Sequence, residues 1–210
     1  MPDHVILAAG RDRFITEVRE RLKAVEAQPI VETFWNPERS AEPRPAAVLI
    51  PLYRDHGEWH VLLTERTHTV AEHRGQVAFP GGKADPTDRD RIETALRETA
   101  EEIGLPPEQV EVLGAMPEFV TSTGYHVTPV AGVIPWPYDL SLSAAELAGV
   151  FGVPLRWVAD PSHLTIEMWD HPVKGPATPV YFYHYGEHTI WGATARMLHA
   201  FVQLVLSIPW

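Results

Sequence analysis

The chain contains no cysteine among its 210 residues. A disulfide framework and a thiol nucleophile are therefore both excluded. No apolar run approaches the roughly 20 residues that a membrane-spanning helix needs, so we expect no membrane partner. The first ten residues contain a short apolar stretch without a basic start, which does not fit a secretory signal, and cytoplasmic residence is the expectation.

Basic residues are also scarce, because 17 Lys and Arg face 28 Asp and Glu and give a net charge of −11. Non-specific nucleic-acid binding requires a basic surface, so nucleic acid is not an expected partner. An acidic protein can still bind an anionic small molecule where a metal ion and local Lys or Arg reverse the field. A hydrophobic content of 45% is enough for a substantial core.

The spacing of apolar residues predicts a helix over residues 11–28, followed by a proline-containing strap over 29–45. We therefore divide the chain into an N-terminal helix and strap (1–45) and a main domain (46–210). Further helices are predicted at 90–103 and 193–208. Strands are predicted at 46–53, 59–67, 76–79, 109–116, 126–134, 150–155, 164–169 and 180–185. Strands in runs favour an α+β or sandwich architecture over a doubly wound one.

The most informative segment is 81–105, where two glycines precede a predicted helix rich in carboxylates. Glu98, Glu101 and Glu102 stand at i, i+3 and i+4, so their side chains share one helix face. Like charges at this spacing repel, and a bound divalent cation would turn that cost into a gain. Carboxylate oxygens are hard ligands that suit Mg²⁺ or Mn²⁺. The alternative is a solvated acidic face with an Arg97–Glu101 ion pair.

From Gly82 through Asp88 to residues 97–105 (RETAEEIGL), this segment resembles the Nudix box. Asp88 stands where a glutamate is usual, the spacer to Arg97 is one residue longer, and Thr99 occupies an apolar position. Residues 62–67 (LLTERT) and 75–82 (GQVAFPGG) resemble the signature of the coenzyme A pyrophosphatase branch of that family. The chain departs from this signature at Ala71, where an arginine is expected, and at Thr67, where serine or alanine is expected.

This resemblance, which spans about residues 46–205, implies a Nudix-type α/β/α sandwich with a mixed β-sheet. It implies a Mg²⁺- or Mn²⁺-dependent pyrophosphohydrolase that cleaves coenzyme A or its derivatives to 3′,5′-ADP and 4′-phosphopantetheine. One alternative is the same chemistry on ADP-ribose or NADH. Another is a non-catalytic nucleotide sensor of the same fold, against which the three clustered glutamates argue. A homodimer is left open.

The resemblance also implies roles for particular residues. Arg97 orients a carboxylate, and either Glu98 or Glu146 acts as the general base. Glu146 is equally well interpreted as an exposed residue at the start of a helix, and Asp88 is interpreted as a structural acid. The expected metal site consists of Glu98, Glu101 and Glu102, with the backbone of Gly82 close by.

Four residues are candidates for substrate binding. Arg66 and Arg74 could bind pyrophosphate oxygens through two parallel hydrogen bonds, or form surface ion pairs. Lys83 either contacts a phosphate or lies in solvent. Tyr125 either stacks on the base or pantetheine chain, or belongs to the core.

Overall fold

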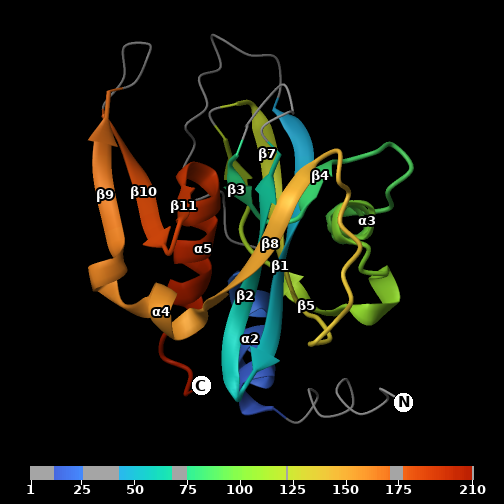
Figure 1. Cartoon of the computed structure of the whole chain (residues 1–210), viewed down its shortest axis with the longest axis horizontal. Coiled ribbons are helices and arrows are strands. Elements are labelled where there is room, and N and C mark those ends of the chain that lie inside the picture. Colours follow the sequence, from blue (N-terminus) through green and yellow to red (C-terminus); the bar gives the residue numbers. More distant parts are fainter. Residues whose placement is uncertain (1–11, 26–42, 68–74, 122, 171–176, 210) are drawn as a thin grey trace.

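A computed structural model describes residues 12–25, 43–67, 75–121, 123–170 and 177–209 (Figure 1). The elements in chain order are α2 (Arg13–Val25), β1 (Arg44–Asp55), β2 (Glu58–Arg66), β3 (Val77–Ala78), β4 (Gly81–Lys83), α3 (Arg91–Ile103), η1 (Pro107–Gln109), β5 (Glu111–Ala115), β6 (Phe119–Val120), β7 (Tyr125–Val133), β8 (Leu147–Pro154), α4 (Leu155–Ala159), η2 (Pro161–His163), β9 (Leu164–Trp169), β10 (Thr178–Tyr185), β11 (His188–Trp191) and α5 (Gly192–Val205). Across these ranges, no helix is long and apolar enough to cross a membrane.

In the described part of the chain, eight strands form one mixed sheet with the central order β3-β2-β1-β7-β5. β1 and β7 run parallel, whereas β1 pairs antiparallel with β2 and β4. β6 pairs with β7, and β8 pairs with β2. Strands β11, β10 and β9 form a separate antiparallel sheet beside α5.

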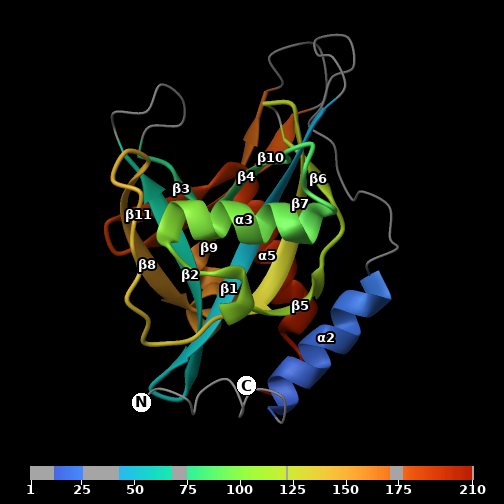
Figure 2. The ribbon, with the colours of Figure 1, turned by 90° about the vertical axis from the view of Figure 1, so that its right-hand side faces the viewer.

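Strand β1 is buried on both faces, which explains its almost unbroken apolar sequence. Ala47, Leu49 and Tyr53 join the cluster that packs under α3. Ile50 and Leu52 alternate with them and join the larger cluster that includes α2 and α5. Helices therefore cover both faces of the sheet, with α3 lying across its strands on one face (Figure 2). The predicted α+β architecture, an α/β/α sandwich with a mixed sheet, is confirmed.

Helix α2 belongs to the same core as the sheet. Phe14 and Leu22 are buried in the cluster that contains α5, and the Phe14 and Trp59 rings stack with centroids 5.0 Å apart. Arg19 forms an ion pair of 2.6 Å with Glu111 at the start of β5. Most of the predicted strap lies outside the described residues, and the division of the chain at residue 45 stays a prediction.

Some elements differ from the sequence-based expectation. Gly81 and Gly82 were not predicted as a strand but belong to β4, because glycine permits close pairing with β1. A Cβ on Gly81, whose φ is +152°, would collide with the Ala47 carbonyl oxygen and Val48 Cα. The strand expected at 150–155 ends at Pro154, and Leu155 begins α4. The short strands β6 and β11 were not predicted.

Replacing Leu22 with alanine should lower the free energy of unfolding by about 2–5 kcal/mol, the usual cost of emptying a fully buried leucine site. Urea denaturation followed by circular dichroism measures this loss. Lys23→Ala, at the neighbouring exposed position, should change stability by less than about 0.5 kcal/mol. Equal stability of the Leu22→Ala and Lys23→Ala proteins would show that α2 is dispensable to the core.

Candidate active site

Helix α3 is fixed at both ends, which sets the positions of its carboxylates. The side chain of Asp90 accepts a hydrogen bond of 2.8 Å from the Glu93 amide, as an N-cap residue does. Gly104 ends the helix in the left-handed conformation, with φ of +70°. Thr99 is tolerated at a buried position because its hydroxyl donates to the Ala95 carbonyl at 2.6 Å.

Arg97 ties the loop before α3 to two of the glutamates. Its Nε and Nη2 donate to the two carboxylate oxygens of Asp88 at 2.9 and 3.0 Å. Its Nη1 donates to Glu98 at 2.8 Å and to Glu101 at 3.2 Å, and Nη2 also donates to the Lys83 carbonyl at 3.0 Å. These hydrogen bonds hold the pKa of Asp88 well below its usual range. The contacts are those of a residue that orients carboxylates.

The Glu98 carboxylate lies directly against β4. A side chain at position 82 would occupy the space of the Glu98 carboxylate, so only glycine allows this approach. Burial raises the pKa of Glu98, and the contact with Arg97 opposes that rise. The Gly82 backbone and the Glu98 oxygens are thus neighbours, as the sequence analysis expected.

Glu102 points inward rather than toward solvent. One of its oxygens accepts a hydrogen bond of 3.1 Å from the Gly81 amide, and the other lies 3.5 Å from Nη1 of Arg66. Burial raises the pKa of Glu102 to about 7, although both of these contacts lower it. The buried Glu102 carboxyl group therefore gives up its proton less readily than an exposed glutamate does.

Arg66 also brings Glu146 into the same group. Its Nη2 lies 3.6 Å from Glu146, whose side chain is 47% exposed. The Glu146 carbonyl accepts a hydrogen bond of 2.8 Å from the Thr67 amide, which attaches this residue to the end of β2. The interpretation of Glu146 as a helix start is wrong, because the residue lies in a turn that leads into β8.

The donor chemistry of this cluster fits a hard divalent cation. Among the residues that the structure describes, no three His, Asp or Glu side chains form a ready metal-binding group, and Arg66 and Arg97 are the cations that contact the glutamates. After burial and these contacts, the charges of Glu98 and Glu146 also raise the pKa of Glu102. Such unbalanced negative charge, next to the glycine backbone of β4, favours a cation with oxygen ligands. Glu101 lies at the margin, with its side chain 62% exposed.

The structure separates two predicted substrate residues from the carboxylates. Lys83 is paired with Ala46, which belongs to the hydrophobic cluster around α2 and α5, and Tyr125 packs against that cluster. Both side chains therefore lie on the sheet face away from α3. Lys83 Nζ is 5.9 Å from the centre of the Tyr125 ring, and the Arg44 guanidinium is 4.2 Å from it. Sequence reasoning missed Arg44, whose only signal is its register opposite Tyr125. Arg74 lies outside the described residues.

One further contact near Arg66 was not expected. Of the two histidines in the β10–β11 hairpin, His184 is exposed. His188 is half-buried instead: it stacks on Phe151 with ring centres 3.7 Å apart, and its Nδ1 lies 3.2 Å from Glu65. The contact joins the three-stranded sheet to β2 and β8, which carry or adjoin Arg66 and Glu146.

Without added metal, Glu102→Gln should remove part of the pH dependence of the unfolding free energy. The raised pKa means that the folded state binds the proton more tightly than the unfolded chain does. Protonated Glu102 therefore contributes to folding stability below about pH 4.5, and this contribution is lost as pH rises through about 7. We expect the variant to exceed the wild type in unfolding free energy at pH 8 by on the order of 1 kcal/mol, but not at pH 5. Urea denaturation in EDTA measures both values.

The matched control for this experiment is Glu101→Gln, because Glu101 is adjacent and exposed. Its stability difference from the wild type should not change between the two pH values. A Glu102→Gln protein that parallels the wild type at both pH values would contradict the raised pKa of Glu102.

Comparison with known proteins gives a consistent family assignment. Residues 43–145 match the NUDIX domain. The chain is 43% identical over 162 residues to the "Uncharacterized Nudix hydrolase NudL" of Photorhabdus laumondii, covering 77% of this chain and 85% of that protein. It is 42% identical over 166 residues to the protein of the same name from Yersinia pestis, covering 79% and 82%.

A solved structure shows the same fold. The crystal structure of a MutT/nudix family protein from Enterococcus faecalis matches with a TM-score of 0.51 and 17% identity, covering 81% of this chain and 65% of that one. With the identities above, these matches show that the chain belongs to the Nudix family and is a hydrolase of phosphorus-containing anhydrides, a family whose members generally use divalent metal ions.

Proposed function

We propose that this hydrolase cleaves the diphosphate of coenzyme A or its derivatives to 3′,5′-ADP and 4′-phosphopantetheine, with Mg²⁺ or Mn²⁺ as its cofactor. The observation that carries the proposal is the position of Arg66. It belongs to the segment that resembles the coenzyme A branch, and it lies 3.5 Å from Glu102 and 3.6 Å from Glu146. The branch-like segment therefore contributes to the carboxylate cluster itself.

We propose that Glu98, Glu101 and Glu102 hold the metal beside the Gly82 backbone. When bound, the metal neutralises charge on the pyrophosphate oxygens and lowers the pKa of a bound water. Arg97 acts as a positioning residue, because all of its described contacts are to the protein's own oxygens. Arg66 is placed to exchange its carboxylate contacts for a pyrophosphate oxygen when substrate arrives.

Two glutamates were candidates for the general base, and the geometry favours Glu146. Glu98 is held by Arg97 at 2.8 Å and packs against Gly82, which suits a fixed ligand. Glu146 stands on a turn with about half of its side chain exposed, so solvent water reaches it directly. We therefore assign removal of a proton from the attacking water to Glu146, and metal binding to Glu98.

Lys83 and Tyr125 lie across the sheet from the carboxylates, so we propose that they bind the far end of a long substrate rather than the diphosphate. Lys83 and Arg44 place two cations beside one aromatic ring. An aromatic face with flanking cations suits an adenine that carries a phosphate. Coenzyme A has a 3′-phosphate on the ribose that carries its adenine, whereas ADP-ribose and NADH have no phosphate at that position.

Mass spectrometry of products should detect metal-dependent release of 3′,5′-ADP and 4′-phosphopantetheine from coenzyme A. The panel includes acyl-coenzyme A, ADP-ribose and NADH, each with Mg²⁺ or Mn²⁺. Glu101→Gln and Glu102→Gln should abolish turnover, and Glu146→Gln should lower kcat by about 10²-fold or more, as loss of a general base does. Glu108→Gln, an exposed glutamate on η1, serves as the control and should retain full activity.

The other outcomes of this panel separate the alternatives. Cleavage of ADP-ribose or NADH but not coenzyme A would keep the chemistry and point to the Ala71 departure as the reason for a different substrate. Metal-dependent binding without product from any substrate would indicate the sensor. Full activity of both Glu101→Gln and Glu102→Gln would refute the metal assignment.

Lys83→Gln should raise the KM for coenzyme A by about tenfold, while leaving the KM for dephospho-coenzyme A unchanged, because only the former offers a 3′-phosphate to Lys83. Steady-state kinetics on the two substrates measure this difference. Arg89→Gln, an exposed cation before α3, should affect neither KM. Equal increases for both substrates would place Lys83 elsewhere on the substrate.

A further inference from the structure

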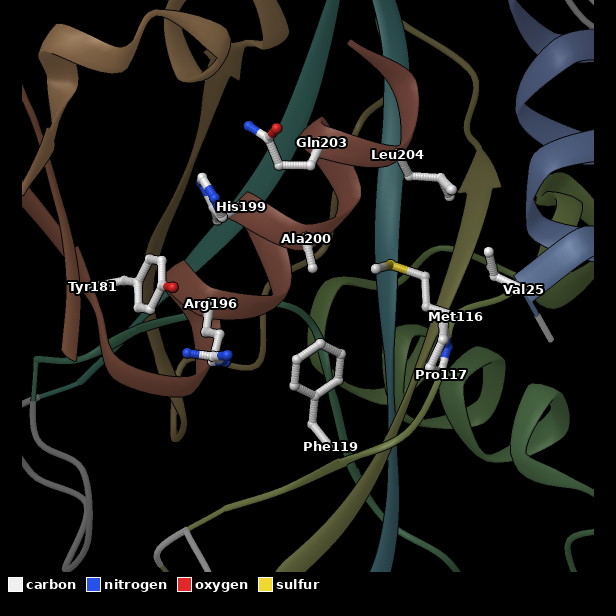
Figure 3. Close-up of a pocket in the computed structure, with 10 residues that line it drawn as sticks. All are labelled: Val25, Met116, Pro117, Phe119, Tyr181, Arg196, His199, Ala200, Gln203 and Leu204. Atoms are coloured by element: carbon white, nitrogen blue, oxygen red, sulfur yellow. The ribbon is translucent and has the colours of Figure 1, made fainter. Parts of the chain in front are cut away.

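A pocket lies on the face of the sheet away from α3. Its volume is about 350 Å³, and it is lined by α5, Tyr181 of β10, the segment from Met116 to Phe119 and the last residue of α2 (Figure 3). This volume falls within the range of small-molecule binding sites, which is roughly 300–1,000 Å³. Because α3 and its carboxylates are on the opposite face, the pocket is separate from the carboxylate cluster, and neither Lys83 nor Tyr125 lines it.

Helix α5 supplies one wall of this pocket through a single stripe of side chains. The stripe consists of Arg196, His199, Ala200, Gln203 and Leu204. These positions follow the i, i+3, i+4, i+7, i+8 spacing of one helix face. The opposite stripe, which includes Phe201 and Val205, is fully buried in the core. The pocket face of α5 therefore carries three polar side chains, those of Arg196, His199 and Gln203, opposite a face that is entirely apolar at Phe201 and Val205.

The polar and apolar groups are segregated within the pocket. Figure 3 shows Arg196, His199 and Gln203 on the side of Tyr181, whereas Met116 and Leu204 lie on the other side. The Arg196 guanidinium is 4.9 Å from the centre of the Tyr181 ring. Burial lowers the pKa of His199, whose Nδ1 forms a hydrogen bond of 3.0 Å with the Tyr183 hydroxyl.

The charge of the pocket defines the ligand that it suits. None of the described residues that line it is acidic, although the chain as a whole carries a net charge of −11. Arg196 is the one permanent cation in this lining. One cation with a neighbouring imidazole and amide matches a single anionic group, whereas a diphosphate needs more positive charge. The remaining wall, with Met116 and Phe119, matches an aliphatic chain.

We propose that this pocket binds a small amphiphilic monocarboxylate, with its carboxylate at Arg196 and its aliphatic chain against Met116, Phe119 and Leu204. The site does not depend on the substrate of the hydrolase. It requires only the wall of α5 and the segment that faces it.

Methionine-methyl NMR with octanoate as the probe tests this site in the full-length protein. With ¹³C-methyl methionine, octanoate should shift the Met116 signal in a saturable way and leave Met168 unchanged, because Met168 is exposed on β9, outside the pocket. Met116→Leu assigns the signal. Octanol, which has the same chain without the charge, should bind about tenfold more weakly.

Arg196→Gln should weaken octanoate binding by about tenfold or more and leave octanol binding unchanged. Arg156→Gln, an exposed arginine on α4, is the matched control and should bind both probes like the wild type. Ala200→Phe, which fills the pocket, should abolish binding of both. If either pocket variant fails to fold, the proposal is tested by comparing the affinities of the wild-type protein for octanoate and for octanol. Octanol binding as tight as octanoate, no shift at Met116, or equal shifts at Met116 and Met168 would overturn the proposal.

Discussion

Strand β1 is the constraint on which the rest of the structure depends. It pairs with β2, β4 and β7, and it is buried on both faces. Since neither face can meet solvent, helices must cover both, and the alternating residues of one strand divide the core into two clusters. Pairing of β4 with β1 then places Gly82 under α3, so the position of the glutamates follows from the register of a central strand rather than from a loop.

The candidate site combines rigid placement with unfavourable charge. Arg97 holds Asp88, Glu98 and Glu101 through a network of hydrogen bonds, while Glu102 is buried with a raised pKa. A carboxyl group in this environment costs stability once it ionises. A core optimised for stability alone would place an apolar residue there. The cost is what makes the position suitable for a cation, because binding removes the repulsion that folding leaves in place.

Sequence reasoning succeeded where a pattern acts locally. The helix over 90–103 was predicted from the sequence, and α3 spans Arg91–Ile103. The assignment of the three glutamates to a metal site stays a prediction. It failed where tertiary pairing decides. Gly81 and Gly82 carry the local signal of a turn, and only their register against Ala47 and Val48 makes them a strand.

Strand pairing that the sequence does not reveal also explains why the positions of Lys83 and Tyr125 were not predicted. Lys83 and Tyr125 were named as candidate substrate residues, with solvent exposure as the alternative for Lys83 and a core position as the alternative for Tyr125. The face on which a strand residue lies depends on register, and a shift of one residue exchanges the faces. No single-sequence pattern reports that register. Arg44 was missed for the same reason, since its partner Tyr125 is 81 positions away in the chain and adjacent only through the parallel β1–β7 pairing.

Lys83 makes contacts on both sides of the sheet, through its backbone on one side and its side chain on the other. Its carbonyl oxygen accepts a hydrogen bond from Arg97 on the side of the glutamates, and its side chain extends toward Tyr125 on the other. The link between the two sides is therefore a single residue within a strand that pairs with β1. The same residue thus supplies a backbone oxygen to the Arg97 network and an ammonium group to the Tyr125 side, so a substitution at position 83 that disturbs the pairing of β4 with β1 acts on both surfaces.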